Sequence, residues 1–170
     1  MWLVPAGLDA PDGLEGFLRE LGRGESGFGG TDYAPESETL EAFLQRLMDS
    51  ARGMNLPPDR VPSTTFWLLE EDGPIAGMSR LRHYLNEELL HHGGHIGYYV
   101  RPGSRGRGHG TEILALTLAE GHRLGIERFL LTVQSTNAAS IRVIEANGGV
   151  MEDERTDSET GEPFRRYWIG

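Results

Sequence analysis

The sequence predicts a single mixed α/β domain: a twisted, mostly antiparallel sheet of six to seven strands, flanked by about four helices. Runs rich in β-branched and aromatic residues, separated by turn residues, predict antiparallel hairpins at residues 63–82 and 150–169. Three other segments, 11–21, 37–52 and 108–124, repeat apolar residues at the spacing of an amphipathic helix. With 170 residues the chain is long enough for one hydrophobic core.

The first part of the chain predicts a strand, two helices and a loop. Residues 1–5 fit a first strand, and the segment 11–21 places leucine and phenylalanine side chains on one helical face. Five glycines among residues 22–35 indicate a mobile loop. The second helix, about 37–52, has an apolar face of its own, which indicates packing rather than recognition.

The rest of the chain alternates strands with helices. Turn residues at 71–74 close the first hairpin, and a link over 82–94, irregular or briefly helical, leads to a strand at 95–100. A further strand at 129–133 precedes the closing hairpin. The helix 108–124 carries one stripe that should lie on the sheet, made of Leu114, Leu118, Gly121 and Leu124.

A glycine-rich turn joins the strand 95–100 to the helix 108–124. Gly106, Gly108 and Gly110 lack a Cβ atom, so the backbone can adopt unusual dihedral angles and approach a bulky ligand closely. The N-terminus of the following helix directs its positive dipole end to the same place. The turn therefore predicts a site for a phosphate-bearing ligand, most simply a pyrophosphate.

Two common nucleotide motifs fit this turn poorly. All 16 basic residues are arginine, and a phosphate loop of the Walker A type needs a lysine. A Rossmann turn needs a third glycine and an acidic residue after the next strand. Here Ile113 replaces that glycine and Gln134 ends the strand, so a dinucleotide-binding enzyme is only an alternative.

Two segments together resemble the coenzyme A signature of the GNAT acetyltransferase superfamily. The spacing Arg105-x-x-Gly108-x-Gly110 is similar to the family's pyrophosphate loop. The segment from Asn137 to Gly149 is similar to the one in which an asparagine follows the fifth strand and a short helix ends at a glycine. Asn137 can also cap that helix with its side chain.

The resemblance implies one GNAT-like domain over residues 1–170, with a coenzyme A-binding core at 62–170 and a variable acceptor-side part at 1–60. In such a fold the sheet splits in a V between strands 4 and 5, and coenzyme A lies in the split. The residues expected to bind it are Val100, Arg105, Gly106, Arg107, Gly108, His109, Gly110, Thr111, Asn137 and Ser140.

The reaction implied by the resemblance is an N-acetyl transfer from acetyl-CoA to an amine. The chain has no cysteine, so an acyl-thioenzyme intermediate cannot form and the amine should attack the thioester directly. A free alkyl amine has a pKa near that of lysine, about 10.4, and needs a base near neutral pH. A coenzyme A-binding module without catalysis is a second alternative.

His95, at the start of the fourth strand, is the first candidate for that base, and a partly exposed histidine without a chemical role explains it equally well. His83 is a second candidate, which could equally line the acceptor pocket. Many superfamily members carry a tyrosine seven residues after the asparagine, where this chain has Ile144. The general acid is therefore expected among Tyr98, Tyr99 and Tyr167, or is water.

Charge and hydropathy limit the partners. The net charge of −10 argues against nucleic acid as a partner. It is compatible with a cationic amine, small-molecule or peptide, which Glu87 and Glu88 could attract, although solvated charges explain these two residues more simply. The sequence lacks a long apolar run and a signal peptide, so we expect no membrane contact and a cytoplasmic protein, with a homodimer left open.

The histidines at 91, 92 and 95 invite a metal hypothesis. His91 and His95 have a spacing that pairs ligands only on a helix, and Gly93-Gly94 disfavour a helix there. Thiolate ligands are also missing. The sequence therefore predicts no metal site.

Overall fold

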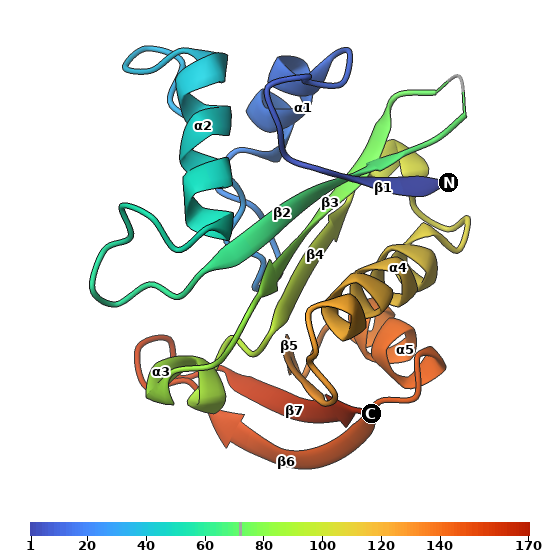
Figure 1. Ribbon diagram of the computed structural model, residues 1–170. Helices are drawn as coiled ribbons and strands as arrows, with labels where there is room; N and C mark the ends of the chain where they lie inside the picture. The colour runs from blue at the N-terminus through green and yellow to red at the C-terminus, as the bar shows by residue number, and fades with distance from the viewer. Residues whose placement is uncertain (72) are drawn as a thin grey trace.

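The computed structural model describes residues 1–71 and 73–170, and in them it has the predicted mixed α/β architecture with seven strands in two sheets (Figure 1). The first sheet has the order β1-β2-β3-β4 and the second β5-β7-β6, and every pair of neighbours is antiparallel. The strands are β1 Trp2–Pro5, β2 Ser63–Leu69, β3 Ile75–Arg82, β4 Ile96–Val100, β5 Phe129–Gln134, β6 Val150–Thr156 and β7 Pro163–Ile169.

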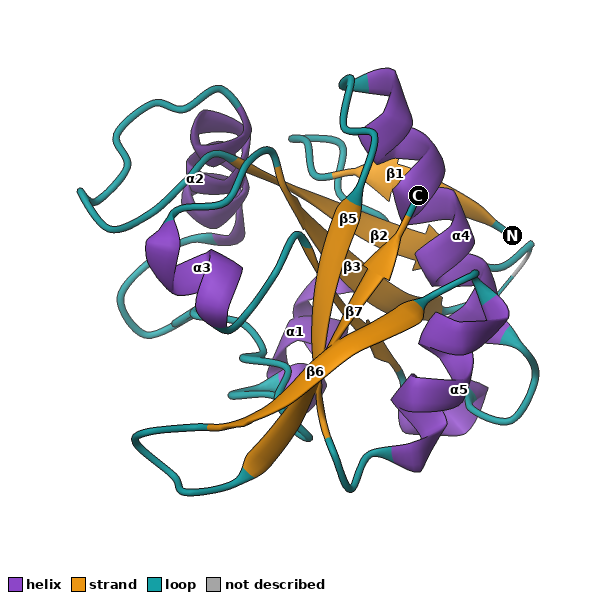
Figure 2. Ribbon diagram, turned by 90° about the horizontal axis from the view of Figure 1, so that it is seen from below, coloured by secondary structure: helices purple, strands orange, loops and turns teal. Residues whose placement is uncertain are grey.

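Five α-helices lie around the sheets in the described residues. In Figure 1, α1 and α2 cover one face of the first sheet, while α4 lies on the opposite face with α5 beside it. Figure 2 shows the second sheet crossing below the first, with α3 next to the end of β3. The helices are α1 Leu14–Leu21, α2 Leu40–Ala51, α3 Glu87–His91, α4 His109–Arg123 and α5 Ala138–Ala146, with a 3-10 turn at Pro102–Ser104.

The core follows from the alternation along β2. Neighbouring residues of a strand point to opposite faces. Phe66 therefore packs with the cluster under α4, whereas Trp67 packs with α1 and α2. The Trp67 ring meets that of Phe17 edge to face, with centroids 6.4 Å apart. The first sheet thus separates two apolar layers, as expected for a hairpin whose strands have apolar residues on both faces.

The predicted elements are found with small shifts that have local causes. The first helix begins at Leu14 rather than residue 11, because Gly13 has a φ of 77°, outside the helical region. The second begins at Leu40, because the Thr39 side chain accepts a hydrogen bond from the N–H of Ala42 and caps it. Leu124, expected on the sheet, is 54% exposed. Within the predicted turn 71–74, Asp72 lies outside the described residues.

In the described residues, backbone hydrogen bonds join the two sheets at the beginning of β4, and the strands then separate. The His95 N–H donates to the Leu130 carbonyl at 2.7 Å, and Gly94 forms an isolated bridge with Leu131. A Cβ at Gly94 would lie 2.3 Å from the Leu130 oxygen, so only glycine allows this approach. Beyond His95, no backbone hydrogen bond joins β4 to β5 in the described chain. This is the V-shaped split between strands 4 and 5 that the resemblance implied.

Candidate functional site

Two adjoining cavities lie at the split. The larger, here called the glycine-turn cavity, has a volume of about 570 Å³ and extends from the end of β4 to the glycine turn and α5. The smaller, here called the arginine cavity, has a volume of about 160 Å³ and lies between β3, β4 and β5. Five residues line both cavities: Ser26, Phe28, Tyr98, Asn137 and Ser140.

The glycine turn offers a row of backbone donors. The N–H groups of residues 106 to 111 make no hydrogen bond within the described chain. Gly106 and Gly108 have φ angles of 77° and 85°, and a Cβ at either position would meet no atom within 4 Å. Gly108 is the N-cap of α4 and has no side chain to cap it. Unpaired N–H groups at a helix N-terminus form a site for phosphate oxygens.

Nine of the ten residues predicted to bind coenzyme A line the glycine-turn cavity. Arg107 is the exception: it is exposed and does not line the cavity. Its N–H still belongs to the open row. The nine are Val100, Arg105, Gly106, Gly108, His109, Gly110, Thr111, Asn137 and Ser140.

Arg105 links the turn to the loop that follows α1. Its Nε donates to the Val100 carbonyl at 2.9 Å, and its Nη2 pairs with the carboxylate of Glu25. The guanidinium carbon also lies 5.6 Å from the centre of the Tyr99 ring, on which Phe28 stacks. The loop 22–35, predicted to be near the acceptor site, therefore borders both cavities.

Asn137 caps α5 as predicted, and it does so at the junction of the cavities. Its Oδ1 accepts from the Ser140 N–H at 3.1 Å. Across the split, the Tyr98 hydroxyl donates to the Ser140 carbonyl at 3.5 Å. Burial raises the pKa of Tyr98 to about 12, so its hydroxyl stays protonated at neutral pH. The junction thus carries hydrogen-bond donors from both sides of the split.

The structure gives His95 a structural environment. Its Nδ1 accepts from the Leu130 N–H at 2.9 Å, and its ring packs edge to face on Phe129. Burial, together with the nearby Arg82, lowers the pKa of His95 to about 4. His95 lines neither cavity, so the geometry does not support it as the base.

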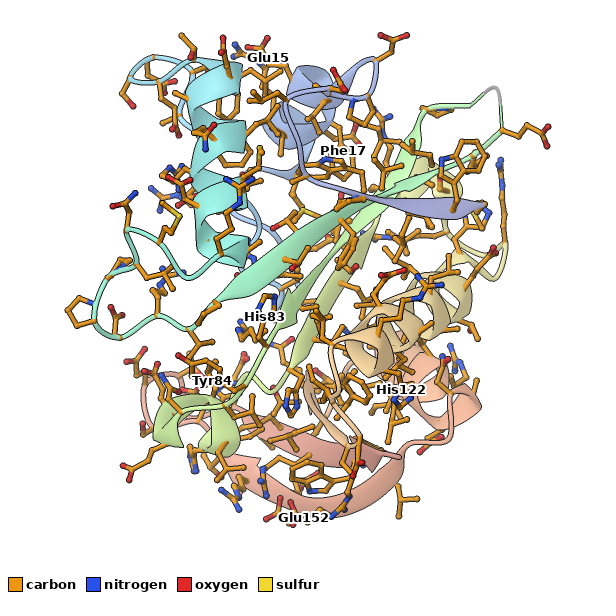
Figure 3. The ribbon with its side chains drawn as sticks, viewed as in Figure 1. Glu15, Phe17, His83, Tyr84, His122 and Glu152 are labelled. Atoms are coloured by element: carbon orange, nitrogen blue, oxygen red, sulfur yellow. The ribbon has the colours of Figure 1, made fainter. Side chains whose placement is uncertain are left out.

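The other two predicted catalytic residues also lie outside both cavities. His83 follows β3 and contacts the Thr64 hydroxyl through Nε2 at 2.9 Å, while the next residue, Tyr84, is exposed beside α3 (Figure 3). Burial lowers the pKa of His83. Tyr167 is buried in the core and its hydroxyl donates to Glu145 at 3.3 Å. These placements favour packing roles.

The arginine cavity contains cations and one histidine. Arg80, Arg82 and His92 line it, and none of its lining residues is Asp or Glu within the chain described. The Nδ1 of His92 lies 3.0 Å from Oδ2 of Asp157, and its ring stacks on Phe164 with centroids 4.1 Å apart. His92 is therefore held in one orientation at the cavity wall.

From the sequence, His92 was considered only as part of a possible metal cluster, and Arg80 and Arg82 were not considered as site residues. Arg80 and Arg82 are two apart in a predicted strand, which places them on one face, and this signal was readable. His92 carried no such signal, because its partner Asp157 lies in the turn before β7. Glu87 and Glu88, considered for attracting a cationic amine, are exposed on α3 and line neither cavity.

Metal and membrane candidates are also absent from the part of the chain described here. Residues 1–71 and 73–170 contain no group of three or more His, Asp or Glu side chains arranged to hold a metal ion. Within the same residues, no helix has both the length and the apolar character needed to span a membrane.

Comparison with known proteins agrees with the geometry of the split. The sequence model of the acetyltransferase (GNAT) family matches residues 31–148, more than half of the chain. The chain belongs to the GNAT acetyltransferase family. Coenzyme A fits this GNAT site, because the open N–H row and Arg105 suit a pyrophosphate and the Asn137 amide lies further along the same cavity.

Solved structures of other GNAT proteins share the fold at low identity. An acetyltransferase of the GNAT family from Streptococcus pneumoniae has a TM-score of 0.66 at 18% identity, covering 99% of this chain and 98% of its own. The spermidine/spermine N-acetyltransferase SpeG of Vibrio cholerae has a TM-score of 0.67 at 15% identity, covering 98% of this chain and 92% of its own. The ribosomal L7/L12 protein acetyltransferase RimL, in complex with coenzyme A, has a TM-score of 0.66 at 16% identity, covering 98% of this chain and 91% of its own. No curated protein sequence matches the chain.

The environment of His95 predicts a pH dependence for the stability of this GNAT domain. The pKa of His95, about 4, lies below the ordinary histidine value of 6.5. Between pH 6.5 and pH 4, the unfolded chain therefore binds a proton at this residue that the folded chain does not. The free energy of unfolding should therefore fall from pH 6.5 to pH 4, by up to about 1.4 kcal/mol per pH unit from this group. In His95→Asn that part of the fall should be missing. Urea unfolding of both proteins across this range measures it, and parallel curves would contradict it.

Proposed function

We propose that this protein is an acetyl-CoA-dependent N-acetyltransferase in which the amine attacks the thioester directly. The observation that carries the proposal is the junction of the two cavities at Tyr98, Asn137 and Ser140. A donor in the glycine-turn cavity and an acceptor in the arginine cavity would meet there. Bound acetyl-CoA supplies the acetyl thioester, and transfer forms a C–N bond while the C–S bond breaks.

The donor side of the proposal rests on the turn and on α5. The N–H groups of residues 106 to 111 bind phosphate oxygens, and Arg105 adds positive charge once its contact with Glu25 opens. Asn137 keeps its amide nitrogen available while its oxygen caps α5. Because the chain has no cysteine, no thiol of the protein can accept the acetyl group.

His92 is the general base in this proposal. Of the side chains that line the arginine cavity, Arg80, Arg82, His92 and Tyr98 are titratable, and only histidine normally titrates near neutral pH. When Nδ1–H donates to the Asp157 carboxylate, Nε2 carries the lone pair that can take a proton from the amine. Phe164 holds the ring in that orientation.

Tyr98 is the general acid. Of the three tyrosines considered from the sequence, Tyr98 lines both cavities, Tyr99 lines the glycine-turn cavity alone and Tyr167 lines neither. Its hydroxyl remains protonated near neutral pH and can donate to the leaving sulfur. Tyr98 then takes a proton back from solvent and His92 releases to solvent the proton that it took from the amine, so that each turnover leaves both side chains as they began.

Two measurements test the function. Acetyl-CoA at about 100 times its Kd should stabilise the protein by about 2.7 kcal/mol in a thermal shift assay, and NAD should not. Thiol release from acetyl-CoA should then depend on an added amine, with mass spectrometry showing the acetylated product. Stabilisation by NAD alone would indicate a dinucleotide-binding enzyme. Stabilisation by acetyl-CoA without amine-dependent thiol release across a broad panel would indicate a binding module.

A further inference from the structure

The charge of the arginine cavity bears on the chemical class of the acceptor. Arg80 and Arg82 both line this cavity of about 160 Å³. Among the described residues lining it, none carries a negative charge. A site built for a polyamine or another polycation would need carboxylates instead, because like charges repel strongly where water is excluded.

The two arginines lie side by side on one face of β3. Arg80 is paired across the sheet with Gly97 of β4, which has no side chain to fill the space beside it. A Cβ at Gly97 would lie 3.3 Å from the ring of Phe28, so this ring covers the space next to Gly97. The guanidinium groups therefore border a covered space, and it continues to the junction at Tyr98.

The contacts of the two guanidinium groups leave most of their donors available. Arg80 makes one long hydrogen bond, 3.4 Å, from Nη2 to the Gly30 carbonyl. Within the described residues, Arg82 donates only through Nη1, to the carbonyls of Gly93 at 3.3 Å and Gly94 at 2.9 Å. A guanidinium has five N–H donors, and every acceptor here is a neutral carbonyl.

The positive charge in the cavity is poorly compensated. Burial lowers the pKa of Arg82 to about 10, repulsion by Arg80 and Arg60 adds to this, and the charge of Glu88 opposes it. Burial also lowers the pKa of Arg80, although Asp32 opposes the shift. Asp32 is itself paired with Arg46 at 2.9 Å. Neighbouring half-buried cations are unfavourable when no carboxylate of the described chain forms an ion pair with either, and a bound anion would remove that cost.

We propose that the acceptor is an amine that carries a carboxylate, and that Arg80 and Arg82 together bind this carboxylate in the arginine cavity. A guanidinium binds a carboxylate through two parallel hydrogen bonds, which fixes its orientation as well as its position. The amino group is then directed to the junction, where His92 and Tyr98 line the wall. The proposal rests on the N-acetyltransferase function and names the acceptor class for the same site.

Binding can be measured without turnover. The protein saturated with coenzyme A is titrated calorimetrically with a panel of aminocarboxylates, namely the L-amino acids, β-alanine and 4-aminobutyrate, and with the carboxamide of each. At least one aminocarboxylate should bind about tenfold or more tightly than its amide, because the amide loses charge-assisted hydrogen bonds. An aminoalkylphosphonate of the same length distinguishes a carboxylate site from a general oxyanion site. Equal binding of acid and amide, tighter binding of spermidine, tighter binding of the phosphonate, or no binding by any aminocarboxylate would overturn the proposal.

Variants locate the binding group. Arg82→Met and Arg80→Met should each weaken binding of the preferred aminocarboxylate about tenfold, while binding of its amide changes little. Arg82→Lys keeps the charge but loses the paired donors, so its affinity for the aminocarboxylate should lie between those of the unmodified protein and Arg82→Met. Arg123→Gln is the matched control, because this exposed arginine on α4 pairs with Glu120 away from both cavities. Thermal melting checks that each variant folds. An unchanged preference for acid over amide in both methionine variants would refute the assignment, whereas failure of thiol release with every amine would refute only the transferase.

Discussion

Gly108→Glu is expected to abolish acetyl-CoA binding, with a loss of affinity of at least about a hundredfold. Gly108 has a φ of 85° and lies in the middle of the open N–H row. No atom lies within 4 Å of a Cβ placed there, so a glutamate side chain would extend into the cavity. It would bring a negative charge to the place where phosphate oxygens bind. Calorimetric titration with acetyl-CoA measures the loss.

Two further substitutions separate charge from backbone strain. Gly108→Ala keeps the site free of charge and adds only the cost of a left-handed backbone, roughly 1–2 kcal/mol of stability. Gly108→Ala should therefore weaken the binding of acetyl-CoA far less than Gly108→Glu does. Gly103→Glu puts the same charge into the neighbouring 3-10 turn, at an ordinary φ and with open space, and Gly103 does not line the cavity. If Gly108→Glu bound acetyl-CoA as tightly as Gly103→Glu does, the turn would not be the pyrophosphate site.

The residues proposed to bind the donor could be selected from the sequence because they are local. Residues 105 to 111 are contiguous, and their glycines, the strand before them and the helix after them all appear in one stretch. The Asn137 cap is equally local, since the side chain bonds the N–H three residues on. Short-range geometry of this kind depends on residue type and spacing alone.

The acceptor half depends on contacts between distant segments. His92 is held by Asp157, and Arg80 reaches a carbonyl in the loop at Gly30. Nothing in the local pattern brings these segments together. The same limit explains His95, because its place at the start of a strand was predictable, whereas the hydrogen bond to the backbone of β5 was not. Strand patterns give alternation, but they do not tell which neighbour a side chain at the strand end will meet.

His92→Gln is expected to lower kcat about a hundredfold or more, with KM changed much less, because a general base acts in the transition state. The acid limb of the pH–rate profile, where the base becomes protonated, should disappear in the variant. Asp157→Asn should also lower kcat, but by less than His92→Gln does. Its side-chain oxygen can still accept from the N–H groups of Glu159 and Thr160, both at 2.8 Å, which keeps the turn in place. The amide nitrogen then faces His92 Nδ1, so the charge and the acceptor for Nδ1–H are both lost.

His91→Gln provides the matched control, because it removes the neighbouring histidine, which is the last residue of α3. His91 contacts the Arg155 guanidinium at 2.8 Å and the edge of the Phe164 ring, and it lines neither cavity. Its kcat and pH–rate profile should therefore match those of the unmodified protein. If His91→Gln and His92→Gln reduced kcat equally, the effect would come from the packing around Phe164. An unchanged acid limb in His92→Gln would move the search for the base to water at the junction, since Tyr98 stays protonated and the remaining titratable groups of the arginine cavity are arginines.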